Sequence, residues 1–297
     1  MSPQPLIEWQ SVLFQYVGFL ASFWMLGAVG FRYGILRGSL GEPSLTRPLD
    51  DAASGAAGIG LLGVGLGLVS LVEGLLKRAE SKHQTIGDAF NAGGATSLAQ
   101  VVLLVALLVG FLLAWRRIAA GWPIAAVAGI AFALRNLLAG KLAGMVNPLH
   151  VLGASLWLGT LFVLVVCGFG QMLRPAVPAK EREQAVAEMV HRFSVVGLGG
   201  SALLGITGLI TGWTHLNPFS ALWTTPYGYA LTAKLCVVGV VVGLGAWNWR
   251  RVGPSLGTVG GALKIRRSAT TELAFAAVVL LLTAILVSVP SPKLPGH

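Results

Sequence analysis

Ser97 to Trp115 reads SLAQVVLLVALLVGFLLAW, a stretch of nineteen residues without one charged side chain. An α-helix needs about 20 apolar residues to cross the hydrocarbon core of a bilayer. In such a helix every backbone N–H and C=O group is paired within the segment, so no polar group faces lipid unsatisfied. The stretch therefore predicts a transmembrane helix.

Seven more stretches of this kind lie on either side of it. Of the 297 residues, 55% are hydrophobic and only 11% are charged, whereas soluble domains carry about 25% charged residues. The sequence predicts an all-α, polytopic transmembrane helix bundle of about eight helices that has the lipid bilayer as its surroundings. The predicted spans are 10–36, 52–76, 97–115, 121–138, 148–172, 194–214, 228–249 and 269–289.

Glycine pairs at a spacing of four residues occur in three of these spans. They are Gly63/Gly67, Gly208/Gly212 and Gly239/Gly243. Small residues at this spacing let two transmembrane helices approach closely. Each pair therefore predicts a helix-packing face.

The basic residues are divided unequally between the two sides of the predicted bundle. The loops between spans 1–2, 3–4, 5–6 and 7–8 hold thirteen Lys and Arg residues, and the termini with the other loops hold five. Cytoplasmic loops carry the excess of Lys and Arg. This predicts a multi-pass protein of the bacterial inner membrane with both termini in the periplasm. It also accounts for the net charge of +10 without nucleic-acid binding.

Two histidines stand at span ends that this topology places outside. His150 opens the fifth span and His215 closes the sixth. Consecutive antiparallel helices are usually neighbours, so both imidazoles are expected at one depth. Neutral imidazole binds copper, zinc and haem iron, and the thioether of nearby Met145 would favour Cu(I). A metal site is one interpretation, and interfacial hydrogen bonding by histidine is the other.

Two ionisable residues also stand out. Lys234 lies ~10 Å into the seventh span, where an ionisable group is costly and commonly functional. It is expected to point into the bundle toward Tyr227 or His215, unless its amine snorkels to the headgroups. Glu272, at the inner start of the last span, is expected to pair with Arg266 or Arg267.

Several classes of enzyme site are missing from the sequence. It contains no GxxxxGK[ST] nucleotide loop and no HExxH, GxSxG or CxxCH motif. Acidic residues are scarce within the spans, which argues against a proton antiporter with a carboxylate relay. We therefore expect a protein that is not an enzyme.

The segment from His150 to Gly159, HVLGASLWLG, resembles the opening motif of the copper resistance protein D (CopD) family, with Trp157 inside it. The resemblance covers roughly residues 146–290. It implies a division into an N-terminal four-helix membrane half, 1–145, and a CopD-like four-helix domain, 146–297. The further motifs, in order, are Arg192-Phe193-Ser194, Thr207-Gly208, Trp213-Thr214-His215, Thr224-Thr225-Pro226-Tyr227-Gly228, Lys234, Asn248 with Arg250-Arg251, and Arg267 with Glu272.

What the resemblance implies is copper transport or copper resistance at the inner membrane, often beside a periplasmic copper-binding protein. It singles out His150, His215, Tyr227 and Lys234. The leading hypothesis is a permease or a membrane copper-binding site that faces the periplasm, with His150 and His215 as copper ligands and Met145 or Tyr227 completing the shell. One alternative is a redox protein in which His150 and His215 are the axial ligands of haem b. Another is an accessory or assembly subunit that packs against a membrane-complex partner.

Overall fold

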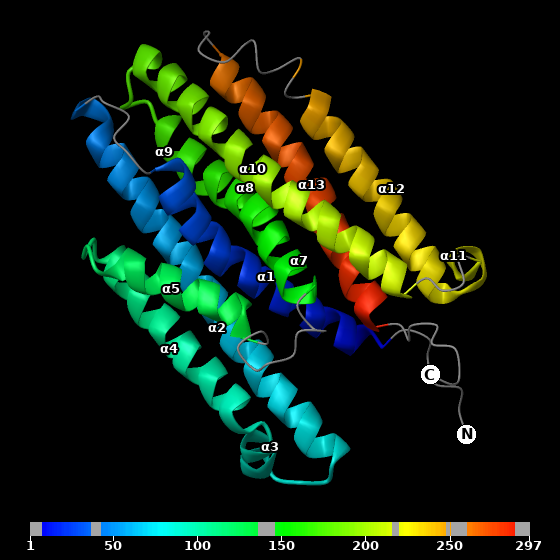
Figure 1. The fold of residues 1–297 in the computed structure, drawn as a ribbon. Coiled ribbons are helices and arrows are strands. Elements are labelled where there is room, and N and C mark those ends of the chain that lie inside the picture. The colour runs from blue at the N-terminus through cyan, green and yellow to red at the C-terminus, as the bar shows by residue number, and fades with distance from the viewer. Residues whose placement is uncertain are drawn as a thin grey trace.

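The computed structural model describes residues 8–36, 43–135, 146–215, 220–247, 250 and 260–288. These residues form helices joined by short turns, and no strand occurs among them (Figure 1). The predicted all-α class is confirmed.

Five long helices and two helices with π-helical segments make up the bundle. The central helix, Val146–Met172, is continuous but alternates between α-helical and π-helical segments: α7 (Val146–Ala154), η4 (Ser155–Gly159), α8 (Thr160–Val163), η5 (Leu164–Gly168) and α9 (Phe169–Met172). The other long helices are α1 (Trp9–Gly30) with its π-helical extension η1 (Phe31–Ile35), α2 (Thr46–Ser81), α4 (Gly94–Trp115), α10 (Ala179–His215), α12 (Pro226–Trp247) and α13 (Gly261–Ser288). The short elements are η2 (Pro43–Leu45), α3 (Ile86–Ala92), α5 (Gly121–Ala133) and α11 (Ala221–Thr224).

Seven helices of the described part are long and apolar enough to cross a membrane, and they match seven of the eight predicted spans. The exception is the span predicted at 121–138. There the described residues form α5, whose 13 residues extend only ~20 Å against a hydrocarbon core of ~30 Å. Residues 136–138 lie outside the described part of the chain.

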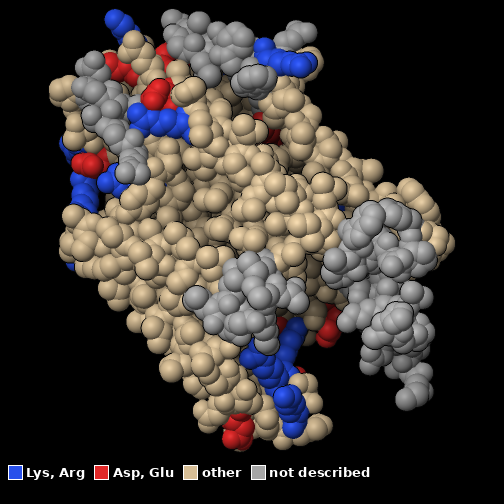
Figure 2. Space-filling view, viewed as in Figure 1, with Lys and Arg blue, Asp and Glu red and all other residues tan. Residues whose placement is uncertain are grey.

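The surface of the bundle fits a bilayer. Figure 2 shows a broad uncharged band, with Lys, Arg, Asp and Glu gathered toward its two ends. Helix α1 begins and α13 ends at the same end of the bundle (Figure 1). This is a multi-pass membrane protein, and the periplasmic orientation of that end stays a prediction.

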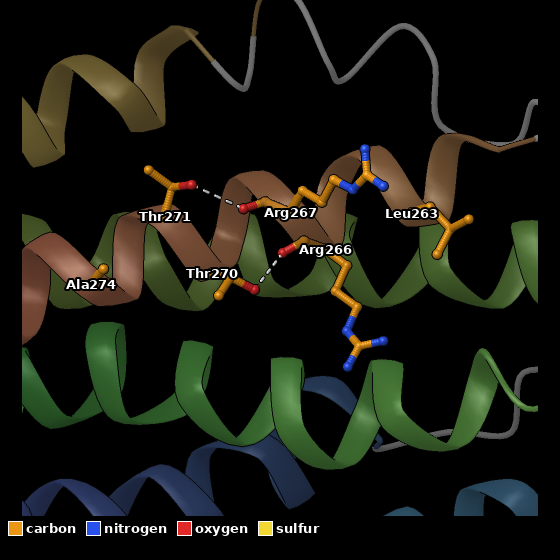
Figure 3. A pocket seen from close by; sticks show the side chains of 6 residues that line it. All are labelled: Leu263, Arg266, Arg267, Thr270, Thr271 and Ala274. Atoms are coloured by element: carbon orange, nitrogen blue, oxygen red, sulfur yellow. Dashed lines mark hydrogen bonds between the residues drawn. The ribbon is translucent and has the colours of Figure 1, made fainter.

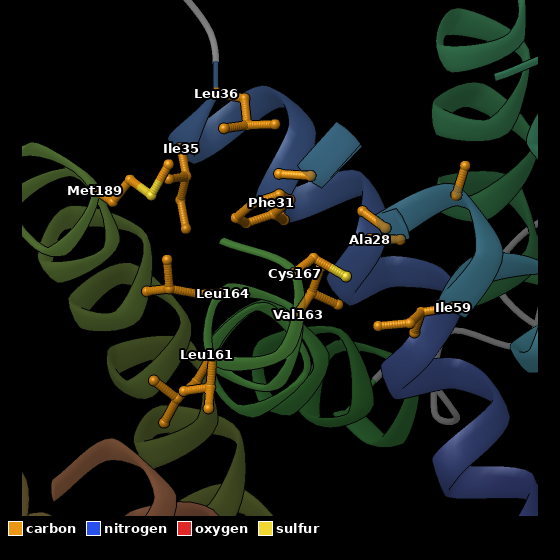
Figure 4. Packing of buried hydrophobic residues seen from close by; sticks show 14 of the residues in the cluster. Ala28, Phe31, Ile35, Leu36, Ile59, Leu161, Val163, Leu164, Cys167 and Met189 are labelled. Carbon is orange, nitrogen blue, oxygen red and sulfur yellow. The ribbon is translucent and has the colours of Figure 1, made fainter. Parts of the chain in front are cut away.

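The hydrophobic core lies where α1 and η1 meet α2, α4, α5, the central helix and the start of α10. Figure 4 shows Ile35, Leu164 and Met189 converging from η1, the central helix and α10. Cys167 is buried in this core, against Gly55 of α2. Helix α12 stands apart and packs chiefly on α13; among its described side chains only Gly228 and Val241 are buried.

One of the three predicted glycine faces packs closely between helices. A Cβ on Gly63 would lie 2.9 Å from Met25 Cγ, and one on Gly67 would lie 3.0 Å from a methyl carbon of Leu104. Around Gly212, Gly239 and Gly243, by contrast, the described residues leave open space within 4 Å. The prediction was wrong for the pair on α12, because that helix exposes most of its surface.

The N-terminus of α13 is capped by a side chain from α10. The buried carboxylate of Glu183 accepts hydrogen bonds from Gly260 N, at 3.2 Å, and Ala262 N, at 2.9 Å. These are two of the backbone N–H groups that a helix start leaves without a partner inside the helix. The negative charge also complements the positive end of the helix dipole. Glu183 therefore fixes the start of α13 against α10.

Replacing Glu183 with alanine should lower the free energy of unfolding by about 2 kcal/mol, because two backbone donors lose a charged acceptor in a buried place. The stability of Glu183→Gln, which keeps one acceptor oxygen, should fall between those of the wild type and Glu183→Ala. Thermal unfolding in mild detergent measures the stability of each variant. The control is Gln184→Ala, at an exposed neighbour on α10. Equal stability of the Glu183→Ala and Gln184→Ala variants would contradict the capping role.

Candidate functional site

The His150 imidazole, on the first turns of the central helix, faces α10. Its Nδ1 lies 3.0 Å from Thr207 Oγ1, and Thr207 is buried. The Thr207 hydroxyl donates its hydrogen to the Leu203 carbonyl oxygen at 2.7 Å and lies 3.2 Å from that of Leu204. A hydroxyl has one hydrogen to donate, so toward His150 it acts as acceptor and Nδ1 carries the ring proton. This tautomer leaves the Nε2 lone pair available to a ligand.

Glycines on both helices make room for this arrangement. A Cβ on Gly153 would lie 2.9 Å from the Gly200 carbonyl oxygen, and one on Gly200 would lie 2.8 Å from that of Gly153. The two backbones are therefore nearly in contact. Next to Thr207, a Cβ on Gly208 would lie 3.5 Å from His150 Cε1, so the Nδ1–Cε1 edge of the imidazole lies against α10 there.

The remaining residues of the HVLGASLWLG segment pack against neighbouring helices. Trp157 is partly buried and packs near Gly197 and Gly200 of α10. Gly159 packs against α1, where a Cβ on Gly159 would overlap the Phe23 carbonyl oxygen. Both glycines of the segment thus set helix-to-helix distances, and His150 is the residue with ligand chemistry.

His215 is the last residue of α10, eight residues beyond Thr207. Its backbone therefore lies ~12 Å farther along α10 than the residue that contacts His150. The side chains of His215 and Tyr227 and the whole of Met145 lie outside the described residues. Shared ligation by His150, His215 and Met145 thus stays a prediction.

Lys234 of α12 is half-buried and close enough to His150 for the two side chains to interact electrostatically. The predicted bonds from Lys234 to Tyr227 or His215 involve side chains outside the described part and stay predictions.

Glu272 differs from its prediction. It is 8% exposed and makes no ion pair with Arg266 or Arg267, although all three residues are described. At 100° per residue, Arg267 points about 140° and Arg266 about 120° away from Glu272 around α13. The carboxylate therefore faces the bundle while both arginines face outward.

The donor set within the described part is small. No group of three or more His, Cys, Asp or Glu residues that could hold a metal occurs among these residues. His150 contributes one imidazole with an available Nε2. Met145, and the side chains of His215 and Tyr227, which lie outside the described part, are the predicted further ligands of a copper ion at His150.

Fold and site together define a multi-pass, all-α membrane protein with an oriented imidazole near one end of its central helix. Residues 187–286 match the family model described as "Copper resistance protein D". This confirms the resemblance predicted from the sequence, with Thr207, His215, Lys234 and Glu272 inside the matched residues. The match does not reach the predicted start near 146, so His150 and Trp157 precede it.

A curated relative is also named for copper. The chain is 28% identical over 159 residues to the protein named "Copper transport protein CutJ" of Bacillus subtilis (strain 168). The aligned region covers 51% of this chain and 26% of that relative, so the chain spans about a quarter of the relative's length. No solved structure matches the chain. The division into halves 1–145 and 146–297 stays a prediction.

Proposed function

We propose that this chain handles copper in the membrane, as a transport or resistance protein and not as an enzyme. The family match over residues 187–286 and the name of the curated relative support copper as the cargo. The observation that carries the proposal is the hydrogen bond from His150 to Thr207. It supports an imidazole ring that is held in one orientation, with the Nε2 lone pair left for a metal ion.

The position of His150 indicates from which side copper enters the site. Copper reaches His150 at the end of the bundle where α1 begins and α13 ends, the end that the distribution of Lys and Arg predicts to be periplasmic. A periplasmic copper-binding protein delivers or receives the ion there. The thioether of Met145 and the imidazole of His215 complete the ligand set. Thioether and imidazole donors suit Cu(I).

The charge of Lys234 also favours the monovalent ion. A positive side chain near His150 repels a divalent ion twice as strongly as a monovalent one at the same distance. The proposed ligands and the charge of Lys234 thus both favour Cu(I). If Cu(I) passes through the bundle from this site, the protein is a permease.

Removing the His150 imidazole should weaken Cu(I) binding by at least about 100-fold, since the loss of an outer-shell partner alone costs 10–100-fold. The measurement is Cu(I) titration of the purified protein against a competing chelator, for the wild type, His150→Ala and His150→Gln. His191→Ala is the matched control, because His191 is exposed on α10 and belongs to no predicted site.

Three results would overturn the proposal. Equal Cu(I) affinity of the wild type and both His150 variants would exclude His150 as a ligand. A Soret band in the purified protein would favour haem b. A wild type that binds neither copper nor haem would favour an accessory subunit.

A further inference from the structure

A shallow groove of ≈ 630 Å³ lies on an exposed face of α13 (Figure 3). It occupies the first turns of α13, where the charged start of the helix passes into its apolar span. The predicted span 269–289 begins within the groove, which puts the groove at the expected level of the lipid headgroups. The lining residues are Leu263, Arg266, Arg267, Thr270, Thr271 and Ala274.

Hydrogen-bond donors in the groove come from its two arginines. Thr270 donates its hydroxyl hydrogen to the Arg266 carbonyl oxygen at 2.8 Å, and Thr271 donates to that of Arg267 at 3.1 Å, as Figure 3 shows. Their hydrogens are therefore used within the helix. Arg266 and Arg267 are exposed, and the ion pairs between described residues involve neither of them. Guanidinium groups bind phosphate oxygens through paired N–H donors.

An apolar stripe continues from the groove along the same face of α13. Arg267, Thr271, Ala274, Val278 and Leu281 follow one another at spacings of four and three residues, and all are exposed. Residues at this spacing lie on one helix face. From Arg267 to Leu281 this face is ~21 Å long, and its apolar part from Ala274 to Leu281 is ~10 Å long, so it extends from the headgroup level into a leaflet ~15 Å deep.

We propose that this face of α13 binds an anionic phospholipid, with its phosphate between Arg266 and Arg267 and an acyl chain along Ala274, Val278 and Leu281. The cationic groove matches the charge of the headgroup. The apolar stripe favours a lipid over inorganic phosphate, because inorganic phosphate has no apolar part to cover it.

The test compares phosphatidylglycerol with phosphatidylcholine, which has the same acyl chains and no net charge. Apparent dissociation constants are measured by lipid titration of the detergent-purified protein, read by native mass spectrometry. The wild type should bind phosphatidylglycerol about 30-fold more tightly, as expected for two arginines near an anionic headgroup. In the double variant Arg266→Gln/Arg267→Gln this ratio should fall close to one.

The matched control is Arg174→Gln/Lys180→Gln, which removes two exposed positive charges at the same end of the bundle. It should keep the preference. A wild type without preference, a double variant that retains it, or a control that loses it equally would each overturn the proposal. So would competition by millimolar inorganic phosphate, because the groove would then select free phosphate and not a lipid.

Discussion

Replacing Gly159 with alanine should keep the central helix and α1 from packing at their native distance. A Cβ on Gly159 would overlap the Phe23 carbonyl oxygen and lie 3.2 Å from Gly27 Cα. A Cβ on Gly27 would in turn lie 2.8 Å from Gly159 Cα. Both contacts involve backbone atoms, so no side-chain rotation relieves them, and one of the two helices has to move.

That movement would disturb the core on both sides of the crossing. We expect Gly159→Ala to lower the free energy of unfolding by about 3 kcal/mol or more, at or beyond the upper end of the usual range for overpacking. Gly27→Ala should have a similar effect. Thermal unfolding in mild detergent and the yield of monodisperse protein measure the loss.

Gly170→Ala is the control on the same continuous helix, because a Cβ there meets no described atom within 4 Å. Alanine is the better helix former by about 1 kcal/mol, so this variant should be as stable as the wild type or slightly more stable. Equal unfolding temperatures for the Gly159→Ala and Gly170→Ala variants would show that the crossing tolerates a methyl group.

The positions of the helices followed from hydropathy, but their packing did not. Stretches such as 97–115 are recognisable because a bilayer requires about 20 apolar residues. Glycine spacing did not reveal which glycines meet a neighbour: Gly159 lies at a tight crossing without a GxxxG partner, and Gly239 has the spacing but faces open space. Close approach depends on the partner helix, and a single helix sequence does not identify that partner.

The same limit applies to the site. His150 was found because a histidine opening an apolar span is chemically conspicuous. Thr207 was noticed only within a motif, since a threonine in a membrane helix commonly bonds to its own backbone, as Thr207 does. Its second role, the hydrogen bond with His150, can be recognised only when the register of α10 against the central helix is known. Because that register brings Thr207 to His150, the His215 backbone lies about two turns beyond the residue that contacts His150, which its position at a span end did not indicate.

If the proposed function holds, Thr207→Val should weaken Cu(I) binding by about 10–100-fold with little loss of stability. Valine has nearly the same shape but offers no oxygen to the Nδ1–H of His150. The imidazole then loses the partner that fixes its tautomer and its direction, an effect of this size for outer-shell partners of metal-binding histidines. Thr207→Ser keeps the oxygen and should restore most of the affinity.

Chelator competition measures the Cu(I) affinities of these variants, and thermal unfolding separates a positioning role of Thr207 from a structural one. If both variants lost stability and affinity in proportion, Thr207 would only be packing the α7–α10 interface. If Thr207→Val bound Cu(I) as tightly as the wild type, the hydrogen bond would have no part in orienting His150.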